Sequence, residues 1–264
     1  MKHLLITSCL ALAITGSAPA ITTLLTDHFD SANDNDVNAA AASRQTGTVT
    51  SSWIEYANDG TWQTQIESNH LLLTGDGNSA PQMGGESLTG NYGAAAEGPL
   101  SLTFDLRQAA SNTLDDWMSV SISNSAFSGN PWVEDAGVAF SVLFRATGGT
   151  SFVNGGGASP SNWSSNTATY STVTIVLSDS VGTGSAFNGN GSLARIYDAS
   201  NTLIATSAAL PQLTSAYFSL GGYSTTSAGT IWNVDNLNIT TIPEPGAATL
   251  LGGLSMLALL RRRR

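Results

Sequence analysis

Alternation of apolar and polar residues along short stretches is the feature of this chain that most restricts its fold. In the stretch 100–107, Leu100, Leu102, Phe104 and Leu106 alternate with Ser, Thr, Asp and Arg residues. Successive side chains of a β-strand point to opposite faces, so the pattern predicts a strand with one buried face. The same alternation predicts further strands at 46–56, 62–67, 70–74, 117–123, 137–145, 169–178, 192–198, 202–206, 216–220 and 230–240.

The spacing of these strands is typical of an antiparallel β-sandwich. No interval between them carries an amphipathic helix long enough for a βαβ unit, and only 33–42 and 115–117 could form a short turn of helix. Two glycine- and serine-rich stretches, 148–167 and 181–191, are expected to be loops. No internal repeat of fixed period is present. The sequence therefore predicts one all-β sandwich domain over 21–240.

Three stretches of this domain resemble the concanavalin A-like (laminin G-like) jelly rolls. They are LLTDHFD at 24–30, the hairpin ARIYDASNTLIAT at 194–206 and the last strand TIWNVDNLNIT. The resemblance implies a jelly roll whose first and last strands lie side by side, with Asp27 or Asp30 near Asp235. Members of the family often bind sugars and some bind calcium, but a fold does not fix a function.

The last residues of the chain have three parts in a fixed order. Pro243, Glu244 and Pro245 come first, and the uncharged run 246–260 follows. The chain ends with Arg261, Arg262, Arg263 and Arg264. As a helix, the uncharged run reaches about 22 Å, which is short for a bilayer core of roughly 30 Å. Flanking arginines can snorkel and should remain in the cytoplasm. We therefore predict a single inner-membrane helix with the domain on the periplasmic side.

This arrangement resembles the C-terminal sorting signal of PEP-CTERM proteins, which are exported proteins of Gram-negative bacteria. An exosortase, a membrane cysteine protease, handles proteins of that class. The resemblance covers about the last 22 residues, within a segment that we delimit as 241–264. It implies a destination at the cell surface or outside the cell, and it leaves the role of the domain open. An ordinary tail anchor that stays in place is the alternative.

The other end of the chain has the features of a secretory signal peptide, residues 1–20. Lys2 and His3 precede the apolar run 4–14, and Ala18 and Ala20 supply the small residues that signal peptidase reads. Cleavage is expected after Ala20, with a cut after Ala18 as the alternative. The signal also contains the only cysteine of the chain. The exported domain therefore has no disulfide, and its hydrophobic core must stabilise it.

The charge of the domain excludes one class of partner. Residues 21–240 hold four arginines, no lysine and 18 acidic residues, which gives a net charge of −14. Such a surface repels phosphate backbones, so nucleic acid is not an expected partner.

The sequence offers no catalytic constellation, so we expect a non-enzymatic protein with no catalytic residues. Adjacent strand residues point to opposite faces, so neither Glu134–Asp135 nor Asp115–Asp116 can form a glycosidase dyad. The two histidines of the domain, His28 and His70, lie in predicted strands. Surface or packing roles are expected for both, because no G-x-S-x-G elbow accompanies them.

The acidic stretch 30–38 is the best candidate for binding a metal. Asp34, Asp36 and Asn38 have the spacing of the first three ligands of an EF-hand, but Ala39 and Gln45 replace its glycine and its final glutamate. A looser calcium site is the remaining metal hypothesis, and its ligands would be Asp30, Asp34, Asp36 and Asp235. The alternative is a polar surface loop whose side chains cap turns.

The tryptophans divide into two groups. Trp53, Trp62, Trp117 and Trp232 lie in predicted strands and should pack in the core or at its rim. Trp132 and Trp163 lie in predicted loops, where an exposed ring could stack on a sugar. A loop tryptophan folded onto the sandwich is the alternative for both.

Three functions remain open. The first is a non-enzymatic surface or matrix protein that associates with extracellular polysaccharide after processing by signal peptidase and an exosortase. The second is a lectin-like carbohydrate-binding module, and the third is a glycan-active hydrolase or lyase with an unfamiliar site.

Overall fold

The computed structural model describes most of the predicted domain. The described residues are 20–57, 62–75, 82–110, 116–127, 137–145, 150–152, 169–182, 184–189, 191–225 and 231–241. The predicted signal peptide and the segment 242–264 lie outside them, as do Trp132 and Trp163. Within the described part of the chain, no helix has both the length and the apolar character needed to cross a membrane.

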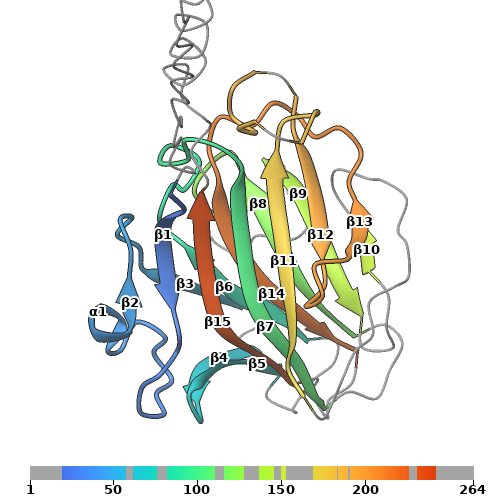
Figure 1. Ribbon diagram of the computed structural model, residues 1–264. Helices are drawn as coiled ribbons and strands as arrows, with labels where there is room; N and C mark the ends of the chain where they lie inside the picture. Colours follow the sequence, from blue (N-terminus) through green and yellow to red (C-terminus); the bar gives the residue numbers. More distant parts are fainter. Residues whose placement is uncertain are drawn as a thin grey trace, which may run out of the picture. The chain divides into compact units, whose positions relative to one another are not determined.

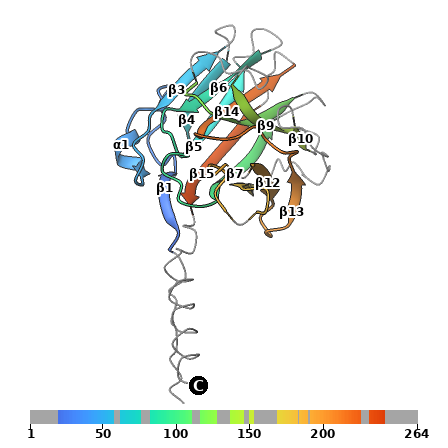
Figure 2. The same ribbon diagram turned by 90° about the horizontal axis from the view of Figure 1, so that it is seen from above.

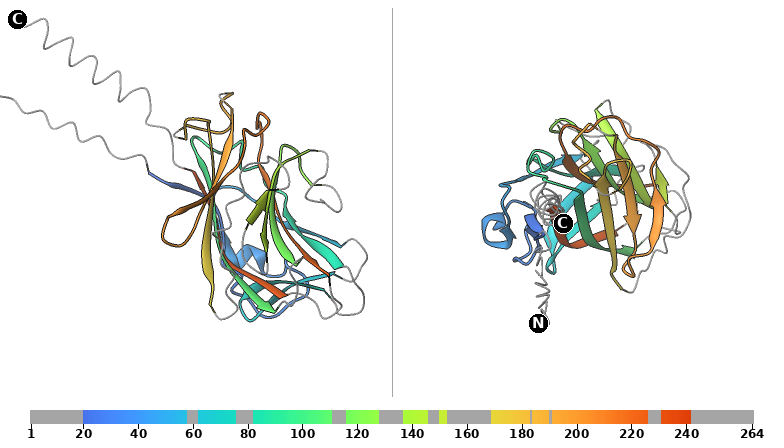
Figure 3. Two further views of the ribbon diagram at one scale, coloured as in Figure 1. Left: turned by 90° about the vertical axis from the view of Figure 1, so that its right-hand side faces the viewer. Right: turned by 45° about the horizontal axis from the view of Figure 1, so that its top comes forward.

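The domain is all-β and consists of two antiparallel sheets, which Figure 3 shows as two facing layers. The nine-stranded sheet has the order β13-β12-β11-β7-β15-β1-β2, with β5 paired to β15 and β4 paired to β5. Its strands are β1 (Thr22–Asp27), β2 (Gln45–Thr46), β4 (Trp62–Glu67), β5 (His70–Gly75), β7 (Leu100–Ala110), β11 (Ser171–Ser178), β12 (Leu193–Tyr197), β13 (Leu203–Thr206) and β15 (Ile231–Thr241). The six-stranded sheet has the order β10-β9-β8-β14-β6-β3. It comprises β3 (Trp53–Ala57), β6 (Gln82–Leu88), β8 (Trp117–Ser123), β9 (Val138–Arg145), β10 (Thr150–Phe152) and β14 (Tyr217–Ser224) (Figure 1).

The first and last strands of the domain are hydrogen-bonded neighbours, as the resemblance implied. β1 and β15 pair antiparallel from Thr22 opposite Thr241 to Asp27 opposite Leu237. Figures 1 and 2 both show the two strands side by side. Residues 21 and 241 therefore lie at the same end of the nine-stranded sheet.

The apolar faces of the two sheets meet in one continuous core. The inward side chains of β7 are fully buried, and Phe104 meets Phe144 of β9 edge-on with ring centroids 6.1 Å apart. Trp53 and Trp232 are buried in this core, with Trp232 completely shielded from solvent, whereas Trp117 is buried in a separate small cluster with Leu143. Burial of these side chains supplies the main driving force for folding in a domain without disulfides.

Two strand predictions are confirmed residue for residue, and others need correction. β4 and β8 have the predicted bounds, whereas the predicted strand 46–56 is two strands separated by the non-strand segment 47–52. The short helix α1 (Ala41–Arg44) begins near the end of the predicted turn 33–42, while Trp117 opens a strand instead of joining a helical turn. β10 lies inside a predicted loop.

The strand β6 was not predicted, because its sequence QMGGESL carries no regular alternation. Its position between β14 and β3 explains why it is nevertheless a strand. Both neighbours pair with it, Leu220 of β14 and Glu55 of β3 lying opposite Glu86. Partners on both sides outweigh the weak strand preference of glycine.

A buried ion pair fixes the start of the domain. Asp27 at the end of β1 is completely buried and accepts a hydrogen bond of 2.7 Å from Arg44 Nε. Gln45 Nε2 and Trp53 Nε1 donate to the same carboxylate at 2.7 and 3.0 Å. Asp27 therefore belongs to this structural cluster and is not a partner of Asp235.

Candidate functional site

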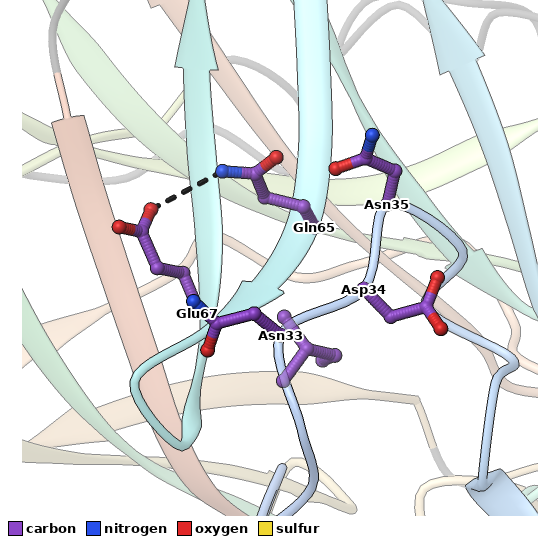
Figure 4. A pocket seen from close by; sticks show the side chains of 6 residues that line it. Asn33, Asp34, Asn35, Gln65 and Glu67 are labelled. Carbon is purple, nitrogen blue, oxygen red and sulfur yellow. Dashed lines mark hydrogen bonds between the residues drawn. The ribbon is translucent and has the colours of Figure 1, made fainter.

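A polar pocket of about 450 Å³ lies where the loop after β1 meets the edge strand β4 (Figure 4). Five of its six lining side chains are amides or carboxylates. The lining residues are Asn33, Asp34, Asn35, Gln65, Ile66 and Glu67. The predicted metal-binding stretch thus contributes one wall of the pocket, and β4 contributes the other.

Backbone pairing attaches the loop to the strand. Asp34 and Ile66 form an isolated antiparallel bridge, with N–H···O distances of 3.0 and 2.8 Å. The backbone N–H of Ser68 donates to Asn33 Oδ1 at 3.0 Å, and the N–H of Asp36 donates to Asp34 Oδ1 at 2.9 Å. The loop that lines the pocket is therefore held by its own turn and by the strand beside it.

The side chains that line the pocket can bind a ligand mainly through hydrogen bonds. Ile66 is buried beneath the pocket, while Asn35 and Glu67 are exposed. Gln65 Nε2 donates to Glu67 Oε2 at 3.2 Å, which leaves the Gln65 oxygen free to accept (Figure 4). Amides offer both donors and acceptors and carboxylates offer acceptors, so the pocket matches a ligand rich in hydroxyl groups.

The hairpin turn beside the pocket connects it to a second polar group. Ser68 and Asn69 form the two-residue turn between β4 and β5, and both have positive φ, 54° and 63°. A two-residue hairpin loop with both residues in this region has the favoured type I′ twist. The carbonyl of Ser68 accepts a hydrogen bond from His70 Nδ1 at 3.1 Å. Ser68 therefore contacts the pocket residue Asn33 through its backbone N–H and contacts His70 through its backbone oxygen.

His70 belongs to a network on the outer face of the nine-stranded sheet. The side-chain amide of Asn233, on β15, lies between His70 and Arg107 of β7. Arg107 can only donate, so the amide is assigned with its oxygen toward Arg107 Nε at 3.2 Å and its nitrogen toward His70 Nε2 at 3.3 Å. The Arg107 guanidinium lies over the ring of Tyr170, with Cζ 4.9 Å from the ring centroid. Partial burial lowers the pKa of His70, so its ring is neutral at pH 7.

A row of carboxylates continues along the same two strands. Asp105 of β7 lies opposite Asp235 of β15. Asp105 accepts from Thr172 Oγ1 at 2.6 Å and from Asn236 Nδ2 at 2.8 Å. His28 Nδ1 lies 3.0 Å from Asn236 Oδ1. The two histidines of the domain thus occupy the two ends of one polar surface.

Asp235 has the most perturbed environment in this row. Burial raises its pKa, and the nearby charges of Asp30 and Asp105 raise it further, while the N–H of Asn236 lowers it. The proximity of Asp30 to Asp235 that the resemblance implied stays a prediction.

The four predicted calcium ligands do not come together as one set. Asp34 and Asp36 each cap a turn by accepting the backbone N–H two residues later. Among the described residues, no three His, Asp or Glu side chains are arranged to hold a metal ion. The calcium site remains a prediction.

Several predicted site residues lie outside the part of the chain that the structure describes. They are Ala18 of the signal cleavage site, Trp132, Trp163, Pro243, Glu244, Pro245, Arg261, Arg262, Arg263 and Arg264. Ala20 is the first described residue and is exposed.

The residues that the sequence did not single out are Gln65, Glu67, Arg107, Tyr170 and Asn233. Alternation placed Arg107 on the outward face of its strand, which is a weak signal. Its partners come from positions far away in the chain, so local sequence could not reveal them.

Comparisons with known proteins leave the family of this chain open. No protein-family model matches it, and no curated protein matches it by sequence. Among solved structures, it is similar to a sialidase (9% identity, TM-score 0.48), covering 72% of this chain but only 17% of that protein. It is also similar to the carbohydrate recognition domain of Emp47p (11% identity, TM-score 0.46, 73% of this chain and 96% of that domain). A third similar structure is peanut lectin (12% identity, TM-score 0.45, 73% and 97%).

The antiparallel sandwich is established by the strand pairings themselves. The finer assignment to a concanavalin A-like jelly roll stays a prediction.

Proposed function

We propose that this protein is an exported, non-enzymatic surface protein whose β-sandwich associates with extracellular polysaccharide. Signal peptidase would remove residues 1–20, and an exosortase would recognise the segment that begins at Pro243. The domain would first be anchored in the inner membrane and would then act at the cell surface or outside the cell. The signal-peptide pattern of residues 1–20 supports a role outside the cytoplasm.

The observation that carries the association with polysaccharide is the polar pocket beside β4. Its amides and carboxylates present donors and acceptors at a surface where sugar hydroxyls could replace water. Its two walls are tied together by backbone hydrogen bonds, so the groups are held in place before a ligand arrives. This arrangement favours the lectin-like form of the proposal.

Binding of a neutral glycan tests the role of the pocket. The exported chain is titrated with soluble dextran and with other neutral glucans and mannans, and affinity is measured by calorimetry. The double variant Asn35→Ala/Gln65→Ala is expected to weaken binding roughly tenfold, because each lost hydrogen bond contributes about 0.5–1.5 kcal/mol. Gln212→Ala, a glutamine outside the pocket lining, is the matched control. Unchanged affinity in the double variant would remove the pocket from the proposal.

The mass of the protein recovered from the cell envelope tests the sorting step. Loss of residues 1–20 together with the residues after Pro245 supports both processing events. An intact C-terminal segment supports the ordinary tail anchor instead.

The same preparation, titrated with calcium after treatment with a chelator, tests the calcium hypothesis through the shift in Tm.

A glycan-active hydrolase is the second candidate, and one observation favours it. Asp105 and Asp235 lie opposite each other on adjacent strands, where Cβ atoms are typically about 4.5–5.5 Å apart. Hydrogen bonds stabilise the Asp105 carboxylate, whereas burial raises the pKa of Asp235. Two carboxyl groups in different environments can act as base and acid. Turnover of any glycan that is lost in Asp235→Asn would favour this candidate over the first.

A further inference from the structure

The outer face of the nine-stranded sheet carries a chain of hydrogen bonds with a fixed direction. His70 Nδ1 donates to the carbonyl of Ser68 at 3.1 Å, which leaves Nε2 of the neutral ring as an acceptor. Asn233 Nδ2 donates to that atom at 3.3 Å, so the oxygen of the amide must face Arg107. Arg107 donates to this oxygen from Nε at 3.2 Å and also from Nη2. Each member of the chain therefore orients the next, and Arg107 is the last.

Arg107 is held in place by neutral groups. Its guanidinium lies over the Tyr170 ring at 4.9 Å and contacts one amide oxygen. A guanidinium has five N–H donors, and Asn233 accepts from two of its nitrogen atoms. Within the described ranges, Arg44 with Asp27 is the ion pair that the structure contains, and Arg107 takes part in none. Its positive charge is thus oriented but not neutralised by direct contact.

The nearest carboxylate on its own strand is engaged elsewhere. Asp105 lies two residues before Arg107 on the same face of β7, and its two oxygens accept from Thr172 and Asn236. Both donors are neutral, and they occupy both carboxylate oxygens. In a domain with a net charge of −14, Arg107 is thus an oriented positive charge with no ion pair among the described residues.

We propose that Arg107 binds the anionic group of an acidic polysaccharide, a carboxylate or a sulfate, while the neighbouring pocket binds hydroxyl groups of the same chain. The two parts are linked through Ser68, whose N–H donates to Asn33 of the pocket and whose carbonyl accepts from His70. The planar fork of a guanidinium matches a carboxylate or sulfate with two parallel hydrogen bonds. Tyr170 adds a half-buried aromatic ring beside that charge. This inference rests on the proposed function, because it names the class of polysaccharide.

The test compares three probes with the exported full chain: polygalacturonate for carboxylate, dextran sulfate for sulfate and dextran as the neutral glycan. The variants are Arg107→Gln, Arg107→Lys and the matched charge control Arg145→Gln on β9. Arg107→Gln should bind the acidic probes about tenfold more weakly or worse, because it removes both the positive charge and the paired donors that an anionic group accepts from. Arg107→Lys should recover only part of this affinity, because it keeps the charge but loses the fork. Arg145→Gln should bind like the wild type.

The outcomes separate this inference from the proposed function. Weakened binding of polygalacturonate alone identifies the group as a carboxylate, and weakened binding of both acidic probes identifies an anion of either kind. Equal affinity of Arg107→Gln and wild type for both acidic probes would overturn the inference, as would binding of dextran with no preference for the acidic probes. Binding of dextran without a preference for the acidic probes leaves the proposed function intact. Failure to bind any of the three probes overturns both the proposed function and this inference. The Tm of Arg107→Gln and of Arg107→Lys is measured as well. A Tm within a few degrees of wild type shows that the loss of affinity does not result from unfolding.

Discussion

At the scale of single residues, the buried charges of this domain are of two kinds. Asp27 is paired with Arg44 and accepts two further side-chain hydrogen bonds, so burial leaves it fully satisfied. Glu86 is equally buried, but neither of its carboxyl oxygens meets a donor in the part of the chain that the structure describes. The first arrangement stabilises the start of the domain, and the second makes the domain sensitive to pH.

Asp27→Asn should destabilise the domain by about 3–5 kcal/mol, because removing one partner of a buried pair leaves the Arg44 guanidinium uncompensated. Urea unfolding followed by tryptophan fluorescence measures the loss. Glu97→Gln, which changes an exposed acidic residue, should have little effect. Equal stability of the two variants would mean that the pair contributes nothing.

Glu86→Gln should remove a pH dependence of stability. Burial raises the pKa of Glu86 to about 9, and the charges of Glu55 and Asp36 add to that shift. The folded state therefore holds a proton that the unfolded chain releases near pH 4.5, and stability falls as pH rises between these two values. The slope reaches at most about 1.4 kcal/mol per pH unit for one proton.

The free energy of unfolding of wild type and Glu86→Gln, measured from pH 5 to pH 8, checks this expectation. The variant should be more stable than wild type at pH 8, with the difference shrinking toward pH 5. Parallel curves for the two proteins would show that Glu86 does not titrate in this way.

At the scale of elements, the six-stranded sheet depends on a close approach between β6 and β14. A Cβ at Gly85 would lie 2.1 Å from the carbonyl oxygen of Leu220 and 2.9 Å from the hydroxyl of Tyr56. That hydroxyl already bonds Ser219 Oγ at 2.7 Å. Gly85 therefore permits the pairing that makes β6 a strand despite its weak sequence pattern.

Gly85→Ala should cost about 1–3 kcal/mol or more through overpacking against backbone atoms that cannot yield. Gly189→Ala is the control, since a Cβ there has no atom within 4 Å and meets only the strain of a φ of +90°. Thermal unfolding of the two variants should place Gly85→Ala clearly lower. A lower Tm for Gly189→Ala would contradict the importance of the close approach.

At the scale of the whole molecule, the domain is a strongly acidic sandwich held by one core. Its net charge of −14 makes its compact state repel itself. Raising sodium chloride from about 10 to 150 mM shortens the Debye length from roughly 30 to 8 Å, so Tm should rise. For a domain of this size each kcal/mol corresponds to about 2–4 °C. A Tm that is flat or falling over this range, measured by calorimetry, would contradict the expectation.

The sequence by itself determined the class of the fold. Alternation along 62–67 and 117–123 gave strand bounds that the structure reproduces, and the absence of cysteine after the signal required a core without disulfides. It also placed Arg107 and Asp105 on the outward face of their strand. These features are local, because the side-chain period of a strand is written in consecutive residues.

Only the tertiary structure decided which residues meet. β6 is a strand because it pairs with β14 and β3 on its two sides. Asp27 forms an ion pair with Arg44 and not a contact with Asp235. The side chain of Arg107 is hydrogen-bonded to Asn233, which in turn contacts His70. Asp34 and Asp36, two of the predicted calcium ligands, each cap a turn in their own loop. Strand pairing and register join positions up to about two hundred residues apart, and periodicity along one strand carries no information about its neighbours.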